Sequence, residues 1–173
     1  SNTLTYIDYF SEMSGSLDET KFKNKDYSSY QTFTFRDAKA LRVNSTLNQN
    51  WNKNNNTSLS LIYRDNTMRQ NPSYRIANDT EFGTTTTGEL NDNSFNSYAA
   101  YLQHNIKLKK FKTNISVGGN IDFSPQTFNA EILNIERNSL GFFDAYTQTG
   151  EFKSDYSSDI LNTGVFLTGN FEP

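Results

Sequence analysis

The sequence contains no cysteine and only one histidine, His104. Without cysteine there is no disulfide framework and no cysteine-ligated zinc or iron–sulfur site, and the redox state of the compartment stays open. A single histidine also cannot form a zinc-binding histidine cluster. Because His104 falls in an apolar row of a predicted strand, we interpret it as a packed or interface-facing ring and not as a metal ligand.

Long apolar runs and a surplus of one charge are missing as well. No stretch approaches the roughly 18 apolar residues of a membrane-spanning helix, and the mean hydropathy is -0.75. These values argue against membrane-spanning helices but not against a transmembrane β-barrel, because barrel strands alternate between apolar and polar residues and have a polar average hydropathy. The 16 basic and 19 acidic side chains are interspersed and form no basic stripe, so we expect no nucleic-acid partner.

Aromatic side chains are what the chain has in quantity, with 10 Tyr and 14 Phe among 173 residues. Disordered chains are poor in aromatic residues. We therefore expect an ordered domain, although the overall hydrophobic content is low.

The clearest pattern lies between Leu41 and Arg64. Alternate residues from Leu41 to Trp51 are mainly apolar and those between them are polar, which is the period of two of a β-strand. The turn-forming run Asn52–Asn56 follows, and the alternation then restarts, so the segment is predicted to be a β-hairpin. Polar side chains such as Arg42 and Arg64 cannot enter a dry core without unpaired donors. Their face is expected to meet water or a polar lumen.

A second hairpin repeats this arrangement. Residues 95–108 and 114–123 alternate in the same way around the short connection Lys109–Thr113. Pro125 is expected to interrupt the second strand, and residues 129–136 are candidates to extend it. Together with 3–10, 41–51, 57–65 and 157–171, the sequence predicts six strands.

The predicted connections between strands alternate between short turns and long loops. Turns at 52–56 and 109–113 contrast with long loops at 11–40, 65–94 and 126–156. Strands of about 10 residues joined in this rhythm are typical of an outer-membrane barrel, with short periplasmic turns and long external loops. We therefore predict an all-β fold, with residues 1–173 forming part of one antiparallel transmembrane β-barrel domain. Single-chain bacterial barrels have at least about eight strands, so six strands predict a fragment of a larger barrel.

The sequence offers no motif for bond chemistry. It has no nucleophile elbow, zincin or P-loop pattern. Its two groups of three acidic residues (Asp18, Glu19 and Asp26; Asp79, Glu81 and Asp92) lack EF-hand spacing. We therefore predict no enzyme activity, no catalytic residue, no metal site and no cofactor. The candidates for binding an anionic ligand, from a loop or the upper lumen, are Arg64, Arg69, Tyr74 and Arg75. A solvated or lipopolysaccharide-facing loop explains the same residues.

Five segments carry a family resemblance: YIDYFSEMSGSL (6–17), QTFTFRDAKALR (31–42), QNPSY (70–74), NDNSFNSY (91–98) and NIDFSPQT (120–127). They resemble barrel segments of TonB-dependent receptors from Bacteroidetes-type bacteria, and the resemblance spans nearly the whole chain. The TonB box, the plug domain and the terminal barrel strand of that family have no counterpart in these residues, which is expected of a mid-barrel piece.

The resemblance implies an outer-membrane transporter that takes up a scarce ligand, such as a ferric siderophore, haem, cobalamin or a glycan. The partners that it implies are outer-membrane lipid, TonB acting through a plug domain, a small ligand such as a metal chelate, and in some systems a surface lipoprotein. Two other interpretations stay open. One is a passive porin-like channel, and the other is a soluble all-β carbohydrate-binding or adhesin domain whose aromatic rings stack on sugars.

Overall fold

The structure, a computed structural model, describes residues 1–13, 17, 19–28, 33–72, 85–139 and 142–171. Its strands are β1 (Asn2–Glu12), β2 (Phe35–Asn52), β3 (Asn55–Asn71), β4 (Thr85–Leu108), β5 (Thr113–Arg137) and β6 (Phe143–Phe171). A short helix, α1 (Glu19–Lys23), lies between β1 and β2, and a 3-10 turn, η2 (Lys109–Phe111), joins β4 to β5. None of the helical segments in these ranges has the length and hydropathy of a membrane-spanning helix.

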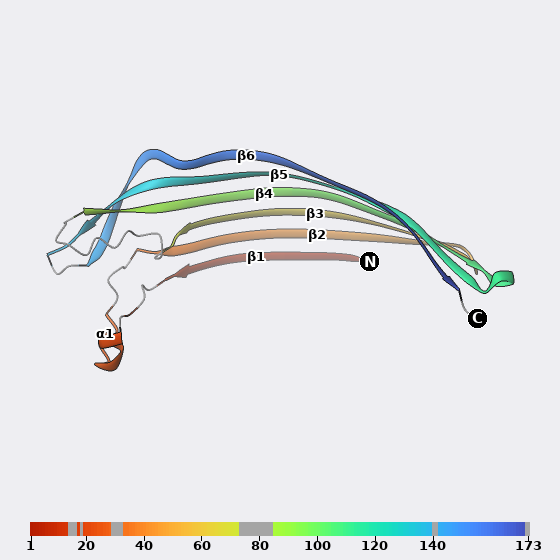
Figure 1. The fold of residues 1–173 in the computed structure, drawn as a ribbon, viewed down its shortest axis with the longest axis horizontal. Helices are drawn as coiled ribbons and strands as arrows, with labels where there is room; N and C mark the ends of the chain where they lie inside the picture. Colours follow the sequence, from red (N-terminus) through yellow and green to blue (C-terminus); the bar gives the residue numbers. More distant parts are fainter. Residues whose placement is uncertain (14–16, 18, 29–32, 73–84, 140–141, 172–173) are drawn as a thin grey trace.

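The strands form one antiparallel sheet in the order β1-β2-β3-β4-β5-β6, so that each strand pairs with its neighbours in sequence. The all-β prediction and the six predicted strands are confirmed. Figure 1 shows a long, bowed sheet with the β2–β3 and β4–β5 turns at one end and, at the opposite end, α1 together with the end of β1 and the start of β2. We call these the turn end and the connection end. β1 and β6 form the two edges of the sheet.

The strands extend further toward the connection end than the sequence predicts. The predicted loop 11–40 is wrong at Ser11 and Glu12, which end β1, and from Phe35 onward, and the loop 65–94 is wrong at 65–71 and 85–94. The loop 126–156 is wrong at 126–137 and 143–156, whereas the proposed strand extension at 129–136 is confirmed. The physical reason is that pairing needs only backbone donors and acceptors on neighbouring strands. Polar and charged side chains such as Asp8, Lys39 and Thr67 interrupt the apolar rows at the connection end, so the apolar alternation that signals a strand is weak there.

Two local predictions are also corrected. Pro125 does not end its strand: β5 continues through it and pairs with Asp159 of β6. The β4–β5 pairing passes from Gln126 to Phe123 without a partner at Pro125, where proline has no N–H to donate. The predicted five-residue turn is in fact only Lys53–Asn54, because Asn52 accepts hydrogen bonds from Asn54 N and Asn55 Nδ2 and closes the turn itself.

The register confirms the predicted alternation and places it in rows across the sheet. Leu47, Leu59, Leu102, Gly119 and Val165 are cross-strand neighbours in one row. The adjacent row contains Thr46, Ser60, Tyr101, Asn120 and Gly164. Because successive residues of a strand point to opposite faces, the first row lies on what we call the apolar face and the second on the polar face.

A small core lies at the connection end. Leu90, Leu133, Ile135 and Phe143 are buried together, and Phe33, Phe35 and Tyr146 pack against them. The rings of Phe33 and Tyr146 have centroids 5.2 Å apart. This is the part of the described chain that resembles the interior of a soluble protein.

Candidate functional site

The apolar face contains a continuous band of exposed apolar side chains. Starting from the connection side, its rows are Leu4/Val43/Tyr63/Tyr98/Phe123/Leu161, Ser45/Leu61/Ala100/Ile121/Thr163, Leu47/Leu59/Leu102/Gly119/Val165, Gln49/Thr57/His104/Val117/Leu167 and Ile106/Ile115/Gly169. Val165 is 93% exposed and Leu167 73% exposed. A patch that crosses a whole sheet in this way marks a surface that meets another apolar phase or a partner.

The band gives way to polar rows on its connection side. The row directly beyond the tyrosine row is mixed and contains Tyr6, Leu41, Asp65 and Asn96; the next rows on the same face contain Asp8, Lys39, Thr67 and Ser94, and then Phe10, Asp37, Arg69 and Asp92. On β4 the band and the next row on the same face together run from Tyr98 to Leu108, about 34 Å along the strand at roughly 3.4 Å per residue. A strand tilt of about 40° would reduce this to roughly 26 Å, close to the height of the apolar belt of outer-membrane barrels, about 25 Å.

Aromatic side chains with a polar atom stand at both borders of the band. On the connection side the Tyr63 and Tyr98 rings lie 5.3 Å apart, and the Tyr63 hydroxyl donates to Asn96. On the turn side Trp51 Nε1 donates to Thr57 Oγ1 at 2.8 Å, and Thr57 Oγ1 is 2.8 Å from His104 Nδ1. His104 thus lies at the border of the band with a hydroxyl partner. The described residues contain no group of three or more His, Cys, Asp or Glu that could hold a metal ion.

The polar face contains an ion pair that spans three strands. Arg64 Nη2 of β3 donates to Asp122 Oδ2 of β5 at 2.8 Å, and the side chains are 32% and 15% exposed. Asp122 Oδ1 accepts from Ser97 Oγ of β4 at 2.9 Å and from Ser124 Oγ at 2.7 Å. Both carboxylate oxygens are therefore satisfied, as a partly buried charge requires. Arg64 Nε is buried and has no hydrogen-bond partner among the described residues.

Beside this pair, a shallow recess of about 240 Å³ opens on the polar face at the β1 edge. Its lining includes Thr3, Thr5, Arg42, Asn44, Ile62 and Arg64. Arg42 and Arg64 are direct cross-strand neighbours, and like charges in that position repel one another. In the described part of the chain Arg64 has Asp122 as counter-ion and Arg42 has none. The recess is therefore electrostatically suited to a small anionic group.

The structure separates the predicted ligand-binding residues. Arg64 lies on the polar face at the recess, whereas Arg69 is an odd number of residues further along β3 and lies on the other face, between Asp37 and Asp92 in register. Tyr74 and Arg75 lie outside the described residues. Ligand binding by these four residues stays a prediction. The sequence analysis missed Asp122, Ser97 and Ser124 as partners of Arg64, because the cross-strand register that brings them together is not visible in a single strand.

The acidic residues considered for metal binding are not brought together in the described part of the chain: Asp26 and Glu19 have local partners, and Asp92 is opposite Arg69 in the register of β3 and β4. Ser28 donates to Asp26 Oδ1 through both its hydroxyl and its backbone N–H, which lowers the pKa of Asp26. Glu19 pairs with Lys23 at 2.6 Å on the surface of α1. Asp18, Asp79 and Glu81 are not among the described residues. Comparison with protein-family models, with curated proteins and with solved structures finds no match for this chain.

Proposed function

We propose that this chain forms part of the barrel of an outer-membrane receptor of the TonB-dependent type, which takes up a scarce ligand such as a ferric siderophore, haem, cobalamin or a glycan. The observation that carries the proposal is the apolar band. It crosses all six strands on one face of the sheet and gives way, through one mixed row, to rows with several charged side chains.

The two faces require different surroundings. The apolar band exposes Leu61, Val117 and Val165, which favours contact with hydrocarbon. The polar face carries the Arg64–Asp122 pair and its serine partners, which favours a hydrated lumen. An up-and-down sheet with one apolar and one polar face supports a barrel wall better than a soluble sandwich, in which the apolar face would need a second layer.

A barrel wall also has to be closed. Each of the edge strands, β1 and β6, has one side without a partner in the described sheet, and an unpaired backbone group in hydrocarbon costs several kcal/mol. In the proposed protein, further strands pair with both edges. Transport would then proceed by capture at the connection end and release through the lumen after TonB acts on a plug domain. No covalent chemistry is involved.

The charge of the recess at Arg42 and Arg64 favours an anionic ligand, such as a metal chelate with carboxylate groups, more than a neutral sugar. This preference follows from the uncompensated Arg42 charge next to the paired Arg64.

The test is expression of the natural gene product in a bacterial outer membrane. The proposal expects a carbonate-resistant membrane protein with heat-modifiable gel migration, low conductance in planar bilayers, and uptake of a ferric chelate or haem that is lost in cells without TonB. High open conductance with uptake independent of TonB would instead establish the porin-like channel. A soluble, carbonate-extractable protein that binds sugars would establish the adhesin-type domain.

A further inference from the structure

Among the described residues of the turn end, every charged side chain is basic; Glu172, which follows Phe171 in the sequence, is outside the described residues. Residues 45–61, 100–121 and 163–171 contain Lys53, Lys107, Lys109, Lys110 and Lys112 and no aspartate or glutamate. All 19 acidic side chains of the protein lie elsewhere in the chain. In the described part of the structure none of these five lysines forms an ion pair. A positive rim of this kind attracts an anionic surface or ligand.

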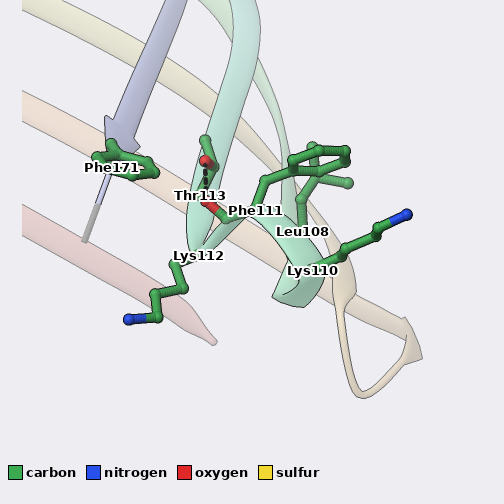
Figure 2. Close-up of a pocket in the computed structure, with 6 residues that line it drawn as sticks. All are labelled: Leu108, Lys110, Phe111, Lys112, Thr113 and Phe171. Carbon is green, nitrogen blue, oxygen red and sulfur yellow. Dashed lines mark hydrogen bonds between the residues drawn. The ribbon is translucent and has the colours of Figure 1, made fainter. Parts of the chain in front are cut away.

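Three of these lysines belong to one ordered turn, which we call the lysine turn (Lys109–Lys112). Its 3-10 geometry is closed by a hydrogen bond from Lys112 N to Lys109 O at 3.2 Å. Lys112 has a positive φ of 46°, and Thr113 Oγ1 donates to Phe111 O at 2.8 Å. Figure 2 shows Lys110 and Lys112 extending in opposite directions from the turn, with Phe111 beside Lys110. The two ammonium groups are thus spread along the rim.

A recess of about 650 Å³ lies at this turn, lined by Leu108, Lys110, Phe111, Lys112, Thr113 and Phe171. Leu108, Thr113 and Phe171 belong to one register row. That row continues the apolar band, directly beyond Ile106, Ile115 and Gly169. The recess therefore joins an apolar surface to two ammonium groups. Exposed phenylalanines next to unpaired lysines are the side chains expected where hydrocarbon meets charged headgroups.

We infer that the lysine turn binds the phosphate of an anionic glycerophospholipid, such as phosphatidylglycerol, whose acyl chains lie on the adjacent apolar band. The inference rests on the proposed membrane location and adds a partner and a site to it. A nucleic acid or an acidic peptide would use the lysines but would leave the apolar half of the recess uncovered. A single lipid satisfies both halves, because phosphate accepts from Lys110 or Lys112 while the acyl chains cover Leu108 and Phe171.

The experiment compares association of spin-labelled phosphatidylglycerol and phosphatidylcholine with the natural gene product in phosphatidylcholine vesicles. The wild type is expected to prefer phosphatidylglycerol at low salt, and the preference should decline as ionic strength rises. In the variant K109Q/K110Q/K112N, the ratio of phosphatidylglycerol to phosphatidylcholine association should fall by a factor of up to roughly five for each lysine removed. Asparagine replaces Lys112 because it tolerates a positive φ.

The matched control is K21Q/K23Q/K25N at the connection end. It removes the same number of charges and includes Lys25, whose φ is also positive at 58°. This control should keep the wild-type preference. Equal association of the two lipids with the wild type, a preference that does not respond to salt, or an unchanged preference in K109Q/K110Q/K112N would overturn the inference while leaving membrane insertion intact. Stronger lysine-dependent association with lipid A than with phosphatidylglycerol would also overturn it. A protein that enters neither kind of vesicle would overturn the proposed function as well.

Discussion

The two halves of the sheet carry similar apolar side chains, which are buried in one half and exposed in the other. At the connection end Leu133 and Ile135 are fully buried under Phe33, Phe35 and Tyr146. At the turn end Val117 and Ile121, on the same strand and in the same alternation, are exposed. The difference is the presence of covering chain. Where other side chains of the protein cover the sheet, the apolar residues form a core like that of a soluble protein. Where no side chains cover it, the apolar residues stay exposed.

The largest expected effect is in the small core. Leu133→Ala should lower the free energy of unfolding by about 2 to 5 kcal/mol, because it leaves a cavity that fully buried neighbours cannot fill. The matched change Leu167→Ala, on the exposed band, should cost much less in lipid vesicles. Urea-induced unfolding of both variants measures the contrast, and equal costs would mean that the band is packed like a core.

The second effect tests the faces of the turn-side half. Leu61→Arg places a charge on the apolar face and should cost about 2 to 4 kcal/mol near the bilayer midplane, whereas Ser60→Arg on the polar face should be tolerated. Heat-modifiable migration reports the assembled fraction of each variant. If the two arginines impair assembly to the same degree, the proposed orientation of the sheet is incorrect.

The third effect concerns the polar face. Asp122→Asn removes the counter-ion of a partly buried guanidinium and should destabilise the protein by about 1 to 3 kcal/mol. Combining it with Arg64→Gln should recover part of the loss, since the two groups interact directly. A double-mutant cycle on unfolding free energies measures the coupling. Strictly additive effects would show that the ion pair contributes nothing beyond its separate members.

The smallest effect is expected at the surface of α1. Glu19→Gln breaks an exposed i,i+4 pair with Lys23 and should change stability by no more than about 0.5 kcal/mol. It is a baseline for the three preceding changes. A loss comparable to that of Leu133→Ala would indicate that α1 has a structural role that its exposed position does not suggest.

The strands and their two faces followed from the sequence where one face is apolar. The alternation of Leu47, Leu59 and Leu61 with Asn48, Ser58 and Ser60 was sufficient, because period two is a property of any extended chain. The same signal was too weak at Phe35–Ala40 and Thr85–Ser94, where polar residues interrupt it, whereas the extension at 129–136 could be recognised. Local turn chemistry was only partly visible, since the side chain of Asn52 shortens its turn.

The candidate site divides in the same way. The sequence by itself determined that Arg42 and Arg64 point away from the apolar face, because the face of a side chain depends on its position along a strand. Only the tertiary structure decided that Arg64 meets Asp122, 58 residues away in sequence, that Arg69 stands on the opposite face, and that Leu133 is covered while Ile121 is not. These outcomes depend on cross-strand register and on which segment folds over which face, and long-range pairing of that kind is not encoded in any local pattern.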